Sequence, residues 1–272
     1  MAVTNFIQTV WSKDILDSLE TACKLVANCH TKYEGDCKFA STVKILGVGE
    51  PTIQDYDRSK GITPVAMDDA GQELHIDQAK AFAFLVDDID QAQSVPGLRE
   101  EYQRKSVHKL AVARDSYVAS LIKGVEGNVS TATNLTPEAV KSAIDDAIVK
   151  LRERDFDEDG VIEVTPAAYK ELKNNLATLS TDNPEYIKRG VVGMYDGFEV
   201  VMSNNMAKDD THSYCAVRGK KAIAFAGQIN EVEALRSDTF FADIVRGLDT
   251  FGAKVIDKAR IQVVKIPLTA TV

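Results

Sequence analysis

Apolar residues recur at every third or fourth position in two long segments of the chain, which predicts two amphipathic helices. The first helix is expected over residues 5–29, where it carries the single tryptophan, Trp11. The second is expected over residues 97–123, directly after Pro96-Gly97. A helix at a chain terminus is poorly ordered unless it docks on something. We therefore expect the N-terminal helix to pack against another surface.

Residues 42–93 show short strand patterns with few apolar residues of their own. Strands are expected at 42–46, 52–54, 74–77 and 80–86, and Lys60-Gly61 is a turn signal. An isolated two-stranded hairpin is marginally stable in water. This long hairpin is therefore expected to lie on another surface, in the same chain or in a neighbouring copy.

The rest of the chain mixes helix and strand patterns without a regular β-α-β alternation. Thr136-Pro137 and Thr165-Pro166 each predict a helix start, with threonine as the N-cap and proline at the first helical position. A loop is expected over 124–134, and residues 238–248 are expected to be helical. Strands are expected at 161–164, on both sides of Asp196-Gly197 within 190–202, and at 214–217, 221–225, 254–256 and 260–266. This mixture predicts an α+β fold.

Charge is distributed unevenly between the long hairpin and the long helix. Residues 50–90 contain ten acidic and three basic residues, a balance of −7, whereas residues 97–123 contain six basic and three acidic residues, a balance of +3. One interpretation is two separate solvated faces. The other is that the acidic hairpin docks on the basic helix, because complementary potentials set register and partner choice.

Composition narrows the class of protein without identifying it. The chain has 272 residues, 44% of them apolar and 27% charged, which is typical of globular proteins and excludes a disordered or fibrous one. The net charge of −9 disfavours sequence-independent wrapping of nucleic acid, which needs a basic face. No apolar run is long enough for a membrane span, and the N-terminus shows no signal-peptide pattern. The cysteines Cys23, Cys29, Cys37 and Cys215 form no C-x-x-C pair, so reduced, packed thiols in a cytosolic chain are expected.

No segment carries an active-site signature. Gly47-Val48-Gly49 follows a strand pattern, but Thr52 stands where a dinucleotide-binding loop has its third glycine. Residues 155–163 resemble the start of a calcium-binding EF-hand loop, but Pro166 occupies the position of the bidentate glutamate. The four histidines are far apart and show no metal-binding spacing. No catalytic residue, cofactor or metal is therefore predicted.

Six stretches, in a fixed order along the chain, share their pattern with one protein family. They are Thr42-Val43-Lys44-Ile45 with Tyr56 and Gly61, Phe84 to Gln93, Asn134-Leu135-Thr136-Pro137, Asp159 to Pro166 with Tyr169 and Leu172, Gly197 to Met206, and Gly252-Ala253-Lys254-Val255. Together they make the chain resemble the major capsid proteins of tailed bacteriophages, which have the Hong Kong 97-type fold. The resemblance covers nearly the whole chain.

The resemblance implies a division of the chain into five segments. They are an N-arm (1–41), an E-loop (42–93), a P-domain with a long spine helix (94–159), an A-domain (160–250) and a C-terminal return to the P-domain (251–272). In this family the E-loop lies over a neighbouring subunit, which favours docking of the acidic hairpin on the basic helix. The expected inter-subunit contacts are Asp55, Asp57, Asp68, Asp69, Glu73, Arg99, Arg104, Lys105, Lys109, Phe6 and Trp11.

The implied function is a structural one, with no enzymatic activity. The chain is expected to assemble as hexamers and pentamers into an icosahedral shell around double-stranded phage DNA, without sequence-specific DNA binding. It is expected to reside in the virion, after synthesis in the bacterial cytoplasm. Because no long N-terminal extension resembles a fused scaffold, a separate scaffolding protein is expected, together with a portal protein and a possible decoration protein. Some relatives cross-link subunits through Lys and Asn, a role that neither Lys60 nor Lys80 matches.

Three other functions remain open from the sequence. The shell could be an encapsulin-like nanocompartment, which shares the fold and holds a cargo enzyme. A different class of function is calcium binding through residues 155–163. The last alternative is an enzyme whose site is assembled from residues that are distant in the sequence.

Overall fold

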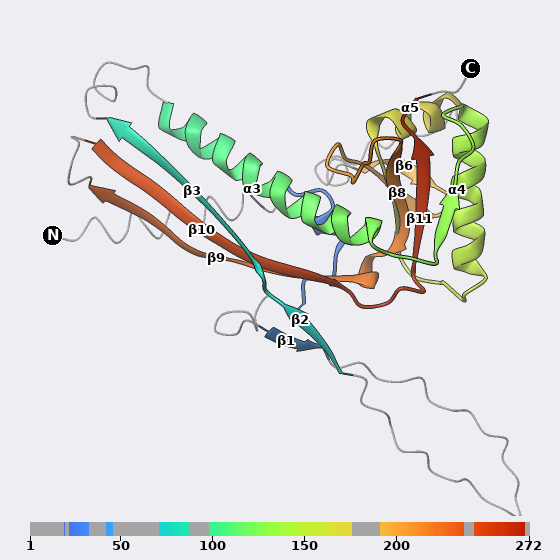
Figure 1. Ribbon diagram of the computed structural model, residues 1–272, viewed down its shortest axis with the longest axis horizontal. Helices are drawn as coiled ribbons and strands as arrows, with labels where there is room; N and C mark the ends of the chain where they lie inside the picture. Colours follow the sequence, from blue (N-terminus) through green and yellow to red (C-terminus); the bar gives the residue numbers. More distant parts are fainter. Residues whose placement is uncertain are drawn as a thin grey trace, which may run out of the picture.

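The computed structural model describes residues 19, 22–32, 42–45, 71–87, 98–175, 191–236 and 242–269 (Figure 1). Their helices and strands form a compact region around a six-stranded sheet and a long arm in which one helix lies along a three-stranded sheet. This confirms the expected α+β class. None of the described helices has the combined length and apolar character needed to span a membrane.

The six-stranded sheet has the strand order β4-β11-β8-β5-β7-β6. Its strands are β4 (Val129–Thr131), β5 (Gly160–Val164), β6 (Val191–Tyr195), β7 (Phe198–Met202), β8 (His212–Gly219) and β11 (Ile261–Pro267). Helices α4 (Pro137–Arg152) and α5 (Pro166–Asn175) cover one face of this sheet. The opposite face packs against the C-terminal part of α3 (Leu98–Lys123) and the N-terminal segment around η1 (Val26–Asn28). All five residues of β5 are buried, as expected for a central strand covered on both faces.

The arm contains strands β3 (Gln78–Asp87), β9 (Ile223–Arg236) and β10 (Ala242–Val255), in the order β3-β10-β9. Helix α3 lies along one face of this sheet (Figure 1). A small ribbon of β1 (Thr42–Ile45) and β2 (Gln72–His75) packs against the start of β9, with Leu74 and Ala224 in their shared core. At Gly252 a Cβ atom would lie 2.1 Å from the carbonyl oxygen of His75, so only glycine lets these backbones approach so closely.

Most expected elements are confirmed, and their local signals explain them. The long helix spans 98–123, and the hydroxyl of Thr136 accepts a hydrogen bond from the Ala139 N–H at the start of α4. Asp196 and Gly197 both have positive φ angles, as the tight hairpin between β6 and β7 requires. The expected strand at 52–54 and the turn at Lys60-Gly61 lie outside the described residues.

The helix expected at 238–248 is wrong, because residues from Ala242 onward belong to strand β10. Val245 and Phe251 are buried against α3, whereas Arg246 and Leu248 are exposed, which is the period of two that a strand requires. Strand β9 extends to residue 236, well beyond the expected 221–225. The loop expected at 124–134 contains the short strand β4, which pairs with β11.

The boundaries expected for the five segments do not coincide with the limits of the three-stranded and six-stranded sheets. The boundary at residue 250 falls inside β10, which is continuous to residue 255. Strands β9 and β10 lie in the arm, although most of their residues belong to the expected A-domain segment. Strands β4 and β11, from two other expected segments, complete the six-stranded sheet.

Candidate assembly surface

Helix α3 and strand β3 run antiparallel to each other along the arm. Near one end, the rings of Phe84 and Tyr102 stack with their centroids 5.9 Å apart. Near the other end, the Tyr117 hydroxyl donates a hydrogen bond of 3.1 Å to Asp77. Between these contacts lie about 23 Å of extended chain and about 22 Å of helix. Because these lengths agree, the helix and the strand stay side by side over the whole distance.

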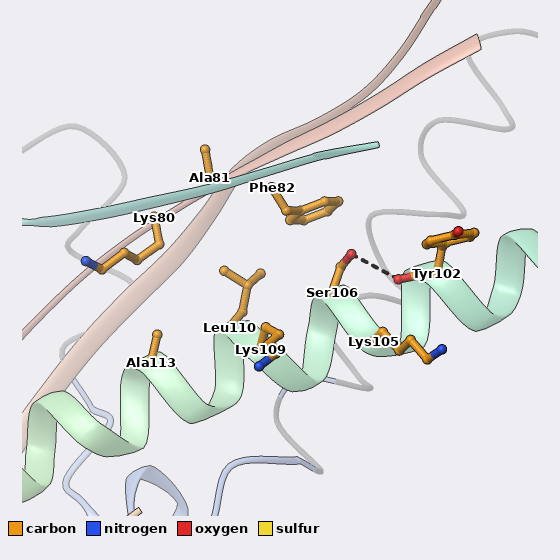
Figure 2. A pocket seen from close by; sticks show the side chains of 9 residues that line it. All are labelled: Lys80, Ala81, Phe82, Tyr102, Lys105, Ser106, Lys109, Leu110 and Ala113. Carbon is orange, nitrogen blue, oxygen red and sulfur yellow. Dashed lines mark hydrogen bonds between the residues drawn. The ribbon is translucent and has the colours of Figure 1, made fainter. Parts of the chain in front are cut away.

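A groove of about 490 Å³ lies between β3 and α3. It is lined by Lys80, Ala81, Phe82, Tyr102, Lys105, Ser106, Lys109, Leu110 and Ala113 (Figure 2). Phe82 and Leu110 supply apolar surface within it, and three lysines supply positive charge. None of the described residues that line this groove is acidic. The groove therefore suits a partner that is acidic and partly apolar.

The cations along α3 differ in how far they are already neutralised. Glu101 pairs with Arg104 at 2.9 Å and with Lys105 at 3.4 Å, and the hydrogen bond from Arg104 lowers the pKa of Glu101. Within the described part of the chain, the side chains of Lys80 and Lys109 form no ion pair or hydrogen bond. These two lysines are therefore available to an acidic partner.

The sheet of the arm has one bare face. Leu85, Ile244 and Leu235 are aligned across β3, β10 and β9, so their side chains form one row. Leu85 is 50% exposed and Leu235 is 41% exposed, on the side of the sheet that faces away from α3. Among the described residues, a single helix, α3, covers one face of this sheet, and the opposite face has no helix or strand packed on it.

Buried charged side chains fix the N-terminal segment between helix α3 and the six-stranded sheet. Asp115 of α3 accepts hydrogen bonds from the backbone N–H groups of Lys24, Leu25 and Val26 at 3.0–3.2 Å, and one from the side chain of Asn205. These N–H groups lie at the start of the η1 turn, where a carboxylate is favoured. Burial raises the pKa of Asp115, and the hydrogen bonds from this backbone oppose that rise.

Arg218 of β8 holds the other end of the same turn. Its guanidinium donates to the carbonyl oxygens of Asn28 at 2.8 Å and Leu25 at 3.3 Å. It also forms a bidentate pair with Glu163 of β5, and both side chains are fully buried. The helix expected through residue 29 is therefore wrong beyond Ala22, because the tight η1 turn held by Asp115 and Arg218 replaces it.

A second buried ion pair lies within the arm. Arg114 of α3 donates to Asp249 of β10 at 2.5 and 2.9 Å. The same guanidinium lies 5.6 Å from the ring centre of Phe225 and 5.8 Å from that of Phe251. This pair fixes α3 on its sheet with bidentate geometry.

The structure places only part of the expected contact set. Arg104, Lys105 and Lys109 are exposed on α3, and Arg99 lies in its first turn. Glu73 is exposed on β2, outside the groove, where its carbonyl oxygen accepts a hydrogen bond from Lys254. The expected contacts Asp55, Asp57, Asp68, Asp69, Phe6 and Trp11 lie outside the described residues.

Sequence reasoning missed Lys80, Phe82 and Tyr102 as parts of the groove. The charge count placed Lys80 in the acidic hairpin, as one of its few bases. Its place beside Lys105 and Lys109 follows from the antiparallel pairing of β3 with α3. That pairing joins residues distant in sequence, and the charge pattern carries no signal for it.

The acidic loop at 155–163 is not built as a calcium site. Glu163 points into the core, where it pairs with Arg218, and Phe156 stacks on Phe198 with ring centres 5.8 Å apart. The described residues contain no group of three or more metal-binding side chains. In the structure the described residues of this loop therefore give no support to the calcium-binding alternative.

The fold combines a compact region with a long helix along a sheet arm, and comparisons with known proteins assign this architecture to the capsid subunits of phages. The family model described as "Phage capsid protein" matches residues 72–265. The chain belongs to this family, and it is a phage major capsid protein of the Hong Kong 97-type fold, which forms the shell of the virion. None of the curated proteins matches it.

Solved structures show the same fold over most of the chain. A chain from Mycobacterium phage Che8 is 28% identical, with a TM-score of 0.68, over 87% of this chain and 89% of that one. The capsid of cyanophage P-SCSP1u is 16% identical, with a TM-score of 0.63, over 84% of each chain. The capsid of a native GTA particle is 10% identical, with a TM-score of 0.64, over 90% of each chain.

Proposed function

We propose that this capsid protein assembles as hexamers and pentamers into an icosahedral shell that encloses double-stranded DNA. The observation that carries the proposal is the groove between β3 and α3, whose three lysines match a strongly acidic segment of the same chain. Repeated contacts between copies then add up, since closure of a shell multiplies contacts that are individually weak. The net charge of −9 suits a container that must not adhere to its polyanionic contents.

The segments have separate roles in this proposal. Residues 1–41 act as the N-arm, and residues 42–93 act as the E-loop that lies over a neighbouring subunit. Residues 94–159 supply the spine helix of the P-domain, and residues 160–250 supply most of the A-domain. Strands β9 and β10 also belong to the P-domain in this proposal, because they form one sheet with β3 beneath α3.

The proposed partners follow from this role. They are further copies of the chain, a separate scaffolding protein, a portal protein and a decoration protein. The chain is made in the cytoplasm of a bacterial host and has no enzymatic activity of its own. DNA is enclosed without sequence-specific contacts.

Electron microscopy of the purified chain, co-expressed with its scaffolding protein, tests the proposal. Closed shells of uniform size, or rings of five and six, are the expected result, with light scattering to give the particle mass. Shells that carry a protein cargo in place of DNA would instead support an encapsulin-like nanocompartment. Persistent monomers in the presence of the scaffold would contradict a shell function.

A charge-reversal variant tests the role of the acidic segment. Asp68→Lys with Asp69→Lys is expected to weaken assembly without unfolding the subunit. Circular dichroism would confirm the fold, and light scattering would measure the loss of shells. Normal shells from this variant would contradict docking of the acidic segment through these residues.

A further inference from the structure

Two lysines and a tyrosine meet where the C-terminal end of α3 reaches the six-stranded sheet (Figure 1). Nζ of Lys123, the last residue of α3, lies 5.0 Å from the ring centre of Tyr214 of β8. Nζ of Lys265 of β11 lies 5.5 Å from the same ring centre. Aromatic rings attract cations through their electron-rich faces, so Tyr214 gathers both ammonium groups at one place.

Both ammonium groups remain available to a partner. Lys123 is exposed and Lys265 is half-buried, and within the described part of the chain neither side chain forms an ion pair or a hydrogen bond. The carboxylate in contact with Tyr214 is that of Asp209, which accepts a hydrogen bond from the Tyr214 hydroxyl at 2.6 Å. It also accepts hydrogen bonds from the backbone N–H groups of residues 211 and 212 at 2.9 and 2.7 Å. Its oxygens are therefore engaged within their own turn, and they neutralise neither lysine.

The sheet adds a hydroxyl group beside Lys265. Thr131 of β4 and Tyr214 of β8 are the partners of Lys265 on its two sides, so the three side chains lie on the same face of the sheet. Thr131 is exposed, and among the described residues its hydroxyl has no hydrogen-bond partner. The C-terminus of α3 carries only about half a negative charge, so the surface around the two lysines remains positive. Two cations and a hydroxyl donor together favour an anion.

The use of lysine indicates which kind of anion fits. A lysine ammonium is a compact charge on a flexible stem, whereas the planar fork of an arginine selects a bidentate partner in one orientation. Two lysines therefore suit anions whose positions vary from copy to copy, such as the phosphates of a DNA backbone. Duplex DNA carries about one negative charge per 1.7 Å of its axis, so a segment that reaches this surface presents phosphates to both lysines. The net charge of −9 repels DNA elsewhere and confines favourable contacts to local sites of this kind.

We infer that Lys123, Lys265 and Thr131 form a sequence-independent contact with the phosphate backbone of the enclosed double-stranded DNA. The two ammonium groups pair with phosphate oxygens, and the Thr131 hydroxyl donates a hydrogen bond to one of them. A single contact of this kind is weak, but it recurs in every copy of the shell, and the contributions of the copies add up. The inference rests on the proposed shell function and specifies where the DNA touches the subunit.

Lysine acetylation with acetic anhydride tests whether DNA covers this surface. Mass spectrometry measures the rate at each lysine in shells filled with DNA, in shells emptied of DNA, and in shells that contain the scaffolding protein without DNA. Lys123 and Lys265 should react several-fold more slowly in the DNA-filled shells than in the emptied ones. Lys141 of α4 and Lys173 of α5 lie on the helices that cover the opposite face of the sheet, and they should react equally in both.

The shells that contain scaffolding protein distinguish DNA from an acidic protein segment. Protection of Lys123 and Lys265 by the scaffolding protein and not by DNA would overturn the assignment to DNA. Equal reactivity in all three kinds of shell would also overturn it, because the two lysines would then only pack on Tyr214.

Removal of the two charges provides an independent test. Shells of Lys123→Gln/Lys265→Gln should form in normal yield but release their DNA at a lower temperature than the parent, because favourable contacts to the packaged DNA are lost. Lys141→Gln/Lys173→Gln removes the same charge from the opposite face and should behave like the parent, as should Lys123→Arg/Lys265→Arg. In about 1 M salt, where the Debye length is about 3 Å, the difference between the variants should disappear. Fluorescence of a DNA-binding dye during heating measures the release.

The outcomes separate this inference from the proposed function. If the parent forms DNA-filled shells and Lys123→Gln/Lys265→Gln releases DNA at the parent's temperature, this inference fails and the shell function stands. If the parent forms no shells with its scaffold, the proposed function fails, and this inference fails with it.

Discussion

The two larger sheets of the subunit are covered to different extents. The six-stranded sheet has α4 and α5 on one face, and the end of α3 with the N-terminal segment on the other. Its central strands are accordingly buried almost throughout. In the part of the chain that the structure describes, the three-stranded sheet of the arm has only α3 on one face, and its other face exposes leucines on all three strands. Within the described residues, the six-stranded sheet is thus covered on both faces, whereas the arm has an uncovered face, an unpaired edge and a groove.

This difference implies that the stability of one subunit and its assembly with other copies depend on different surfaces of the protein. Buried apolar area is the main source of folding free energy, so the stability of the subunit should reside in the core of the compact region and in the face of the arm sheet that packs on α3. The open surfaces of the arm contribute little to the fold of one chain. They are the places where contacts with other copies can be made, and substitutions in the two regions should therefore have different consequences.

The largest loss of stability is expected from Arg218→Met. This substitution leaves Glu163 buried without its partner and removes the donors to the carbonyl oxygens of Leu25 and Asn28. Breaking a buried ion pair from one side costs about 3–5 kcal/mol of unfolding free energy. Urea denaturation of the subunit measures this cost. The double variant Arg218→Met/Glu163→Met should recover a large part of it, and a single variant that loses less than about 1 kcal/mol would contradict the role of the pair.

A core substitution in the compact region should have the next largest effect. Leu151 is fully buried between α4 and the six-stranded sheet, so Leu151→Ala should cost about 2–5 kcal/mol. Val149 lies on the same helix and is 53% exposed, which makes Val149→Ala a matched control expected to change stability by at most about 0.5 kcal/mol. Thermal or urea unfolding distinguishes them. Equal effects of the two substitutions would show that α4 does not cover the core as described.

A smaller and pH-dependent effect is expected from Asp115→Asn. The substitution weakens the hydrogen bonds to the N–H groups of residues 24–26, at a cost of about 1–2 kcal/mol. Hydrogen exchange should show faster exchange of these amides, while the amides of α4 remain protected as a control.

The pH dependence of the unfolding free energy shows whether ionisation of the Asp115 carboxyl group stabilises or destabilises the native state. Burial raises the pKa of Asp115 above its ordinary value of 3.8, so the native state holds this proton at pH values where the unfolded state has lost it. The stability of the parent relative to Asp115→Asn should therefore fall as the pH rises through the window above 3.8. A relative stability that rises with pH would show that the four hydrogen bonds outweigh the cost of burial.

The sequence predicted the elements whose signals are local. Helix α3 follows from its own apolar spacing, and α4 follows from the Thr136-Pro137 start and a clean apolar face. The hairpin at Asp196-Gly197 follows from a dipeptide that tolerates positive φ angles. In each case the information lies within a few residues, so no distant contact is needed to interpret it.

The missed features depend on contacts between distant residues. Residues 242–248 mix small, charged and apolar residues in a pattern that does not distinguish helix from strand by itself, and pairing with β3 and β9 decides the outcome. The helix at the N-terminus ends early because Asp115 and Arg218, far along the chain, hold the η1 turn. The groove likewise needs Lys80 of β3 beside Lys109 of α3. The lysines that α3 contributes to the groove could be predicted from the charge pattern of residues 97–123. The contribution of β3 to the groove, and the unpaired edge of that strand, could not.

The smallest effect on stability is expected from Leu85→Ser in the arm. Leu85 lies on β3, is 50% exposed and faces away from α3, so its removal uncovers no core and should change the unfolding free energy by at most about 0.5 kcal/mol. Phe251→Ala is the matched control on the opposite face, because Phe251 is fully buried against α3 and its loss should cost about 3–5 kcal/mol. Urea denaturation of the unassembled subunit measures both. If Leu85→Ser costs as much as Phe251→Ala, the outer face must be covered within a single chain, and the contrast between a complete region and an open arm does not hold.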